Sequence, residues 1–334
     1  MVPIVGAAGG AIVNLVFIDR SPSRPPTLSV CSDCIEWVTN RDTDILRGAL
    51  STLASTVSPF LTTSSKAFGQ PVCRLGLASY GQTSLSVDDM LYAVGRGLNF
   101  LNWQGIVESS GDTFSKAVSA LGDLRPKVVL SVQFGARTAD AAALELKSNL
   151  SALGTDYIDV LTLYYVERAE EWDEIISPGG ALQYLREAQR NGVVRQIGVT
   201  SHQRKLAARM AASGLLDVLM IRYNAAHRGA EQDVFPITQP AGLPLIAYTA
   251  LRWGWLLRAT PGDPPRFSLP RAPDWYRFVL QHPAVSVALA APQSRAELDE
   301  NLKVLDTMGP LSDAEYAALA AHGERVRRYA GSFA

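Results

Sequence analysis

The stretch "ADAAALELKSNLSALGTDYIDVLTLYY", residues 139–165, decides the fold. Residues 139–153 have the pattern of a helix, and they end at Gly154, where a residue in the left-handed conformation is wanted. Residues 157–165 then form a continuous apolar run of strand length, as expected for a strand that is buried on both faces. A helix, a tight turn and a doubly buried strand together predict one unit of a parallel α/β sheet.

The same alternation extends over most of the chain. We expect strands at residues 72–78, 98–103, 127–134, 157–165, 193–200, 217–224, 243–251 and 285–291. We expect helices between them at residues 87–96, 113–121, 139–153, 181–191, 204–213, 230–234, 275–281 and 295–306. Helical segments are followed by glycine at positions 97, 154, 192, 214 and 242, which supports these ends.

Strands and helices alternating eight times predict a parallel sheet with right-handed crossovers, and the span fits a (β/α)8 TIM barrel of about 250 residues. A doubly wound sheet is the main alternative. It usually carries a G-x-G-x-x-G fingerprint after its first strand, and "LGLASYGQ", residues 75–82, has the wrong spacing. The barrel is therefore favoured, and residues 312–329, which begin with a capping serine, predict an extra C-terminal helix outside it.

The beginning of the chain lacks this periodicity. Residues 1–66 are expected to form a poorly ordered N-terminal extension, or a non-native start, before a barrel domain at residues 67–334. An apolar run at residues 4–18 is shorter than the ~20 residues of a spanning helix, and no basic residue precedes it. A cryptic signal or anchor stays open as an alternative.

Charge and cysteine content limit the partners. The 31 lysines and arginines nearly balance 32 aspartates and glutamates, so no basic field favours nucleic acid or a membrane surface, and a small molecule or a protein is the expected partner. Three cysteines are too few for a disulfide framework and indicate a reducing, cytoplasmic location. Cys31 and Cys34 form one CxxC without a second pair or a nearby histidine, so we expect no metal site.

In a (β/α)8 barrel the reacting groups follow the carboxyl ends of the strands. The polar and aromatic residues expected there are Tyr80, Asn102, Trp103, Gln133, Tyr164, Thr200, Ser201, His202, Arg222, Asn224, Tyr248, Thr249, Arg252, Ser294, Arg295 and Asn301. This set contains no carboxylate pair and no cluster with metal-ligand spacing, which argues against a glycosidase or a metal hydrolase.

The motifs in this chain also have a family resemblance. "LGLASYG", "GLNFLNWQG", "LGTDYID", "IGVTS", "AYTAL" and "ELDENL" occur in the order and spacing of the aldo/keto reductases, and the likeness covers residues 69–310. This resemblance implies a (β/α)8 barrel that binds NADP(H) in extended form, with the nicotinamide in the barrel mouth. It also implies that the protein reduces carbonyl groups.

The catalytic positions of the family are altered here. The resemblance places Asn102 at its aspartate, Val107 at its proton-donating tyrosine, Gln133 at its lysine and Tyr164 at its histidine. A lone buried charge is costly, whereas two neutral amides can hydrogen-bond to each other, so Asn102 and Gln133 look like a compensated pair. Tyr164 then becomes the candidate proton donor, and His202 is a further acid/base candidate.

The cofactor positions implied by the resemblance are better retained. Tyr248 matches the tyrosine that stacks on the nicotinamide, Thr200 and Ser201 match the pair that holds its carboxamide, and Glu300 and Asn301 match the pair at the adenine. The remaining candidates, for the phosphate groups, are Arg252, Gly254, Ser294 and Arg295. Met220 and Glu297 depart from the family, which has glutamine and often arginine there, so NADP(H) and NAD(H) both stay open.

Three functions follow as hypotheses. The leading one is an oxidoreductase of the aldo/keto reductase type that reduces a carbonyl or imine of a small molecule with an altered acid/base site. The second is a catalytically inactive barrel that binds cofactor or metabolite and acts through a protein partner. The third is a lyase or isomerase that uses Tyr164 and His202.

Overall fold

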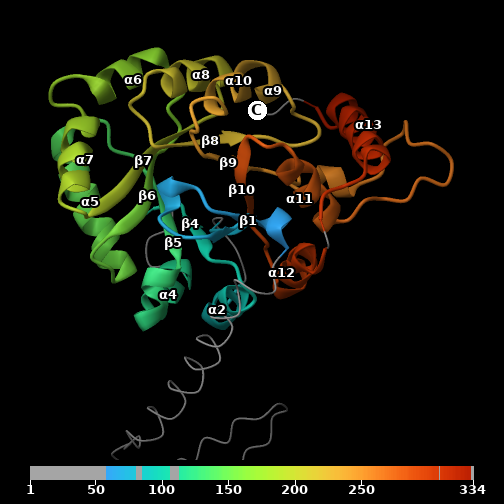
Figure 1. Ribbon diagram of the computed structural model, residues 1–334, viewed down its shortest axis with the longest axis horizontal. Helices are drawn as coiled ribbons and strands as arrows, with labels where there is room; N and C mark the ends of the chain where they lie inside the picture. Colours follow the sequence, from blue (N-terminus) through green and yellow to red (C-terminus); the bar gives the residue numbers. More distant parts are fainter. Residues whose placement is uncertain (1–57, 80–84, 106–112, 308, 332–334) are drawn as a thin grey trace, which may run out of the picture. The chain divides into compact units, whose positions relative to one another are not determined.

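The computed structural model describes residues 58–79, 85–105, 113–307 and 309–331. Eight parallel strands close into a barrel in the order β10-β3-β4-β5-β6-β7-β8-β9, which confirms the predicted (β/α)8 TIM barrel (Figure 1). The strands of the barrel are β3 Leu75–Ala78, β4 Phe100–Trp103, β5 Val129–Phe134, β6 Ile158–Leu163, β7 Val194–Ser201, β8 Val218–Arg222, β9 Leu245–Tyr248 and β10 Val285–Ala290. Each lies inside its predicted segment except β7, which ends one residue later at Ser201.

Helices cover the outside of the barrel (Figure 1). They are α2 Val87–Gly95, α4 Thr113–Ser119, α5 Ala139–Leu153, α6 Ala169–Ile176, α7 Ala181–Arg190, α8 Arg204–Ala212, α9 Ala230–Asp233, α10 Phe235–Thr238, α11 Ala272–Gln281, α12 Arg295–Leu302 and α13 Asp313–Tyr329. Short 3-10 turns are η1 Pro59–Leu61, η2 Lys66–Phe68, η3 Gly122–Lys127, η4 Trp255–Leu257 and η5 Lys303–Asp306. Every predicted helix is present, including α13, whereas α6 and α10 were not predicted.

The turns behave as the sequence indicates. All five glycines predicted to follow helices have positive φ angles, and Gly154 ends α5 in the left-handed conformation with φ 60°. A side chain at this position would be strained in that conformation and would also meet the Ser119 hydroxyl at 3.0 Å. The tight end of α5 therefore sets the start of β6.

The segment before the barrel closes its amino-terminal end. β1 Thr62–Thr63 pairs antiparallel with β2 Val72–Cys73, so the single strand predicted at residues 72–78 is divided between β2 and β3. Between them, Phe68 packs edge-on against Phe100, the first residue of β4, with ring centroids 5.5 Å apart. Residues 58–66, which were predicted to belong to the extension, contain η1 and β1 and are therefore structured. Residues 1–57 lie outside the described residues.

One arginine fastens this segment to the neighbouring strand β10 and to α11. The Arg74 guanidinium donates to the carbonyl oxygens of Phe60 at 2.8 Å, Leu280 at 2.7 Å and Val285 at 2.6 Å. These acceptors come from η1, α11 and β10, so a single planar side chain joins η1 to two elements about 200 residues later in the sequence.

The motif "LGTDYID" builds a second charged cluster near the start of the strands. Asp159 binds Arg125 at 2.8 Å and Arg195 at 2.6 Å, and it also accepts the Leu130 N–H at 3.0 Å. The Tyr157 ring contacts both guanidinium groups, at 4.2 and 4.0 Å. This motif therefore stabilises the barrel at the end opposite the strand carboxyl ends. Within the part of the chain that the structure describes, no helix is long and apolar enough to cross a membrane.

Candidate functional site

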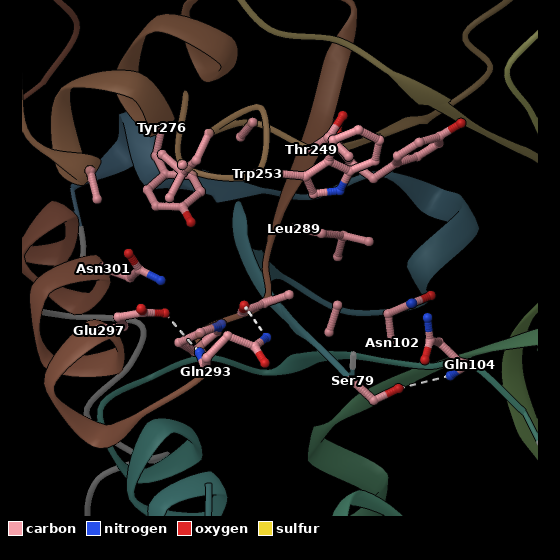
Figure 2. Close-up of a pocket in the computed structure, with 18 of the residues that line it drawn as sticks. Ser79, Asn102, Gln104, Thr249, Trp253, Tyr276, Leu289, Gln293, Glu297 and Asn301 are labelled. Atoms are coloured by element: carbon pink, nitrogen blue, oxygen red, sulfur yellow. Dashed lines mark hydrogen bonds between the residues drawn. The ribbon is translucent and has the colours of Figure 1, made fainter. Parts of the chain in front are cut away.

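A cavity of about 850 Å³ opens at the carboxyl-terminal end of the barrel strands (Figure 2). Its lining includes the last residues of two strands, Ala78 of β3 and Tyr248 of β9, and the penultimate residues Asn102, Gln133 and Leu289. This is the end at which (β/α)8 barrels carry their active sites, and the volume lies in the upper part of the ~300–1,000 Å³ range of ligand pockets.

The floor of the cavity is a network of neutral polar groups. Gln133 Nε2 donates to Asn102 Oδ1 at 3.1 Å and to Met220 Sδ at 3.1 Å. The Thr200 hydroxyl donates to Gln133 Oε1 at 2.8 Å, and the Ser131 hydroxyl donates to Asn102 Oδ1 at 3.0 Å. The expected amide–amide contact between Asn102 and Gln133 is therefore present, and four strands are joined without any formal charge.

These contacts fix the orientation of the Asn102 amide. Its Oδ1 already accepts two hydrogen bonds, so the Nδ2 group is left as a donor. None of the described residues accepts from Nδ2, and Asn102 lines the cavity. The geometry can therefore present an N–H donor to a ligand oxygen, although an amide cannot transfer a proton at neutral pH.

An aromatic cluster forms one wall. Tyr164 and Tyr165 stack with centroids 3.8 Å apart, and the Tyr165 ring lies 4.3 Å from the His202 ring. His202 in turn meets Tyr248 edge to face at 5.6 Å. Tyr165, a member of this cluster, and Thr249, which follows Tyr248, have positive φ angles of 44° and 56°. Such strained backbone is found preferentially at ligand and active sites.

The electrostatics of this wall favour neutral side chains. Burial lowers the pKa of His202; the adjacent Glu167 carboxylate opposes this effect and the Arg222 charge adds to it. Glu167 also holds the residue in place, because its Oε1 accepts the His202 backbone N–H at 2.7 Å and lies 3.2 Å from Nδ1. Burial raises the pKa of Tyr248 well above its usual range, and its hydroxyl donates to the Ser201 carbonyl oxygen at 3.2 Å. Burial of His202 therefore favours the neutral form of its imidazole, whereas Glu167 favours the charged form.

Helix α12 and the loop before it form another part of the lining. Ser294 caps α12 by accepting the Glu297 N–H at 3.3 Å, and Glu297 Oε2 accepts the Gln293 N–H at 2.8 Å. The side chains of Glu297, Glu300 and Asn301 line the cavity from one face of this helix, as Figure 2 shows for Glu297 and Asn301. Tyr276 of α11 also lines the cavity near α12.

The structure brings together most of the predicted site residues. Those that line the cavity are Asn102, Gln133, Tyr164, Thr200, His202, Tyr248, Gly254, Glu300 and Asn301. Those that do not line it are Ser201, Arg252, Ser294 and Arg295. Tyr80 and Val107 lie outside the described residues.

Each of the four exceptions has a physical reason. The Ser201 hydroxyl accepts the Gln203 N–H at 3.1 Å, and Ser294 is the cap of α12. Arg252 is buried and donates to the Gly331 carbonyl oxygen at 2.5 Å. The Arg295 guanidinium lies 3.8 Å from the Tyr92 ring and binds Asp89 of α2 at 3.0 Å, so it points to the helix layer instead of the cavity.

Sequence reasoning missed several lining residues, which are Ser79, Gln104, Arg258, Tyr276 and Gln293. The rule that reacting groups follow strands would have found Ser79 and Gln104, since Gln104 follows β4 directly and its N–H donates to the Ser79 hydroxyl at 2.9 Å. Tyr276 gave no such signal, because it lies within a helix. Across the described ranges, no group of three or more histidine, cysteine, aspartate or glutamate side chains is placed to hold a metal ion.

Known proteins show the same fold. An aldo-keto reductase from Bacillus halodurans, in its holo form, superposes with a TM-score of 0.65 at 18% identity, covering 80% of this chain and 96% of that one. An aldo-keto reductase from Klebsiella pneumoniae, solved in complex with NADPH, gives a TM-score of 0.61 at 20% identity, covering 79% of this chain and 95% of that one.

Sequence comparison carries the identification further. A D-threo-aldose 1-dehydrogenase from Pseudomonas sp is 28% identical over 131 residues, which is 38% of this chain and 39% of the length of that relative. The sequence model of the aldo/keto reductase family matches residues 75–274, a span that contains the barrel from β3 to β9 and the start of α11. On this match the chain belongs to the aldo/keto reductase family.

Proposed function

We propose that this protein is a nicotinamide-dependent oxidoreductase that reduces the carbonyl or imine group of a small molecule with an altered acid/base centre. One observation carries the proposal: a single cavity joins the candidate cofactor residues Thr200, Tyr248 and Asn301 to the altered positions Asn102 and Gln133. Membership of a family of oxidoreductases supports it.

The lining fits a nicotinamide dinucleotide. Tyr248 offers an aromatic ring in the wall, Thr200 offers a hydroxyl on the floor, and Gln293 and Asn301 offer amides at the α12 end. Such a mixture of apolar surface and a few fixed polar groups is typical of cofactor pockets. A bound nicotinamide would supply the hydride chemistry, and NAD(H) and NADP(H) are the candidate forms.

The chain's own residues would bind and polarise the substrate. Asn102 Nδ2 is the N–H that the floor network aims at the cavity, so we assign it to the substrate oxygen or nitrogen. Tyr164, whose ring is held against Tyr165, is the candidate proton donor at the same wall. His202, whose backbone and ring contact Glu167, is the candidate that moves a proton between this wall and solvent.

The neutral side chains at Asn102 and Gln133 limit the class of substrate that the site can reduce. A neutral N–H or phenol donor without a neighbouring cation stabilises developing negative charge less than the same donor beside a cation does. A carbonyl that is already activated by a neighbouring group, or an imine that is protonated in solution, needs less stabilisation. We therefore propose activated carbonyls and imines as the substrate class.

The test has two steps. The first is a fluorescence titration of the protein with NADH and NADPH, and the second is a hydride-transfer assay on a panel of activated carbonyls and imines. We expect saturable binding and turnover, with turnover reduced at least ~100-fold in Tyr164→Phe. Tyr329→Phe is the matched control, because Tyr329 is 54% exposed on α13 and does not line the cavity.

Two other outcomes of these assays would favour or refute other functions. Binding without turnover on the whole panel would favour the catalytically inactive barrel, for which the uncharged network of Asn102, Gln133 and Thr200 is the supporting observation. Absence of binding to either nucleotide would refute both cofactor-dependent functions.

A further inference from the structure

The face of α12 that lines the cavity carries carboxylates where a phosphate group would need cations. Glu297 and Asn301 are four residues apart and so lie on the same face of α12 (Figure 2). Glu300 also lines the cavity. Tyr276 lies nearby, since the Glu297 charge contributes, after burial, to the raised pKa of its phenol. This end of the cavity is therefore polar and acidic.

The two carboxylates differ in how they are compensated. Glu300 binds Lys303 at 2.8 Å and Arg271 through a bidentate contact, so two cations neutralise it. Glu297 forms no ion pair with any described residue; its Oε2 accepts the Gln293 N–H, and its Oε1 is left for the cavity.

The nearest candidate cation on the same helix is committed elsewhere. Arg295 binds Asp89 at 3.0 Å and Asp299 at 3.1 Å, and its guanidinium lies against the Tyr92 ring. Three partners hold it between α12 and α2, outside the cavity lining. Moving it to the cavity would break two ion pairs and a cation–π contact.

We propose that Glu297 selects a dinucleotide with a free ribose diol at this end of the cavity, so that the protein binds NAD(H) in preference to NADP(H). The inference rests on the proposed function, and it names which form of cofactor the site takes. The reacting ring belongs at the end with Asn102 and Tyr248, which leaves the adenosine half for the α12 end. A carboxylate there accepts hydrogen bonds from ribose hydroxyls, and it repels the charge of a 2′-phosphate.

Arg258 provides an internal comparison. It is the one lysine or arginine among the described residues of the lining, and its guanidinium lies 4.8 Å from the Trp255 ring in the loop after β9. We assign it to the diphosphate, which both cofactors share. Arg258→Ala should weaken NADH and NADPH binding by the same factor, whereas a change at Glu297 should act on their ratio.

The experiment measures dissociation constants of NADH and NADPH by fluorescence for the full chain and for variants. We expect the wild type to bind NADH at least about tenfold more tightly, equivalent to ~1.4 kcal/mol. Glu297→Gln keeps an acceptor for the Gln293 N–H and should reduce the ratio several-fold, while Glu297→Arg should reverse it. Glu324→Gln, an exposed carboxylate on α13, is the matched control and should leave the ratio unchanged.

Two results would contradict the preference for NAD(H) without contradicting the proposed oxidoreductase function. Equal or tighter binding of NADPH by the wild type overturns the inference and leaves the proposed oxidoreductase standing. An unchanged ratio in Glu297→Gln does the same, because the preference would then have another origin. If neither nucleotide binds, the proposed function fails and the inference fails with it.

Discussion

The contact between the neutral amides of Asn102 and Gln133 can be tested by introducing a charge at each position, first singly and then at both. Asn102 and Gln133 are each 4% exposed, and their amides are 3.1 Å apart. In Gln133→Lys an ammonium replaces the amide that donates to Asn102 and Met220 and accepts from Thr200. In Asn102→Asp a carboxylate replaces the amide but still accepts from Ser131 and Gln133.

The expected losses in the free energy of unfolding differ because the two side chains have different hydrogen-bond partners. An unpaired buried charge costs about 3–5 kcal/mol, and Gln133→Lys should reach this range since it also leaves the Thr200 hydroxyl without its acceptor. Asn102→Asp should cost less, about 1–3 kcal/mol, because two donors already face the oxygen. In the double variant the two charges attract each other at roughly 3 Å, by up to ~5 kcal/mol at an effective dielectric constant near 20.

Urea unfolding of the four proteins gives the free energies of unfolding for a double-mutant cycle. We expect a coupling energy of at least ~2 kcal/mol, so that the double variant loses less stability than the sum of the two single losses. The slope with urea must stay constant for the comparison to hold. Additive losses would refute the reasoning, because they would mean that the two positions do not share one compensated contact.

Three further predictions concern stability. Asp159→Ala should lower the free energy of unfolding by about 3–5 kcal/mol in urea, because it leaves the buried Arg125 guanidinium without its partner, and Asp159→Asn should cost less. Gly105→Ala should lower it by about 1–3 kcal/mol, since Gly105 has φ 86° and a Cβ there would lie 2.4 Å from the Gln133 carbonyl oxygen. Burial of Asp263 opposes its ionisation, but hydrogen bonds from the Thr260 N–H and from Arg325 outweigh this and lower its pKa to about 2. The ionised form of Asp263 therefore stabilises the fold above about pH 4, and this stabilisation, about 1 kcal/mol after solvent screening, is lost as the pH falls towards 2. In Asp263→Asn the unfolding temperature, measured over the same pH range, should depend less on pH.

The barrel was predictable because its signals are local and repeated. Strands buried on both faces are apolar throughout, so each one stands out from the amphipathic helices around it. The boundaries were less accurate at the amino-terminal end of the barrel, where Arg74 interrupts the apolar run 72–78 and separates β2 from β3. Helix α6 escaped prediction because its two buried side chains, Trp172 and Ile175, lie among four acidic residues.

The cavity lining was predictable where a residue lies within or directly after a strand, and less so elsewhere. Asn102, Gln133 and Tyr248 reach the cavity because strand geometry alone directs them there. For residues on helices and loops the side-chain direction depends on partners from other elements. Arg295 points away from the cavity because Asp89 of α2 binds it, whereas Tyr276 of α11 lines the cavity. Neither orientation can be predicted from the neighbouring residues in the sequence.

The floor network joins Asn102 and Gln133 into one hydrogen-bonded unit. Both Gln133 Nε2 hydrogens are used, one towards Asn102 and one towards Met220, and the Gln133 carbonyl is used by Thr200. A charge at either amide position would therefore disturb contacts on several strands, so any proton donor must come from outside this network. The side chains that can donate and also line the cavity are concentrated on the wall of Tyr164 and His202. If chemistry persists in this barrel, its proton should therefore pass through the aromatic wall, and the amide floor should serve only to hold the substrate atom in place.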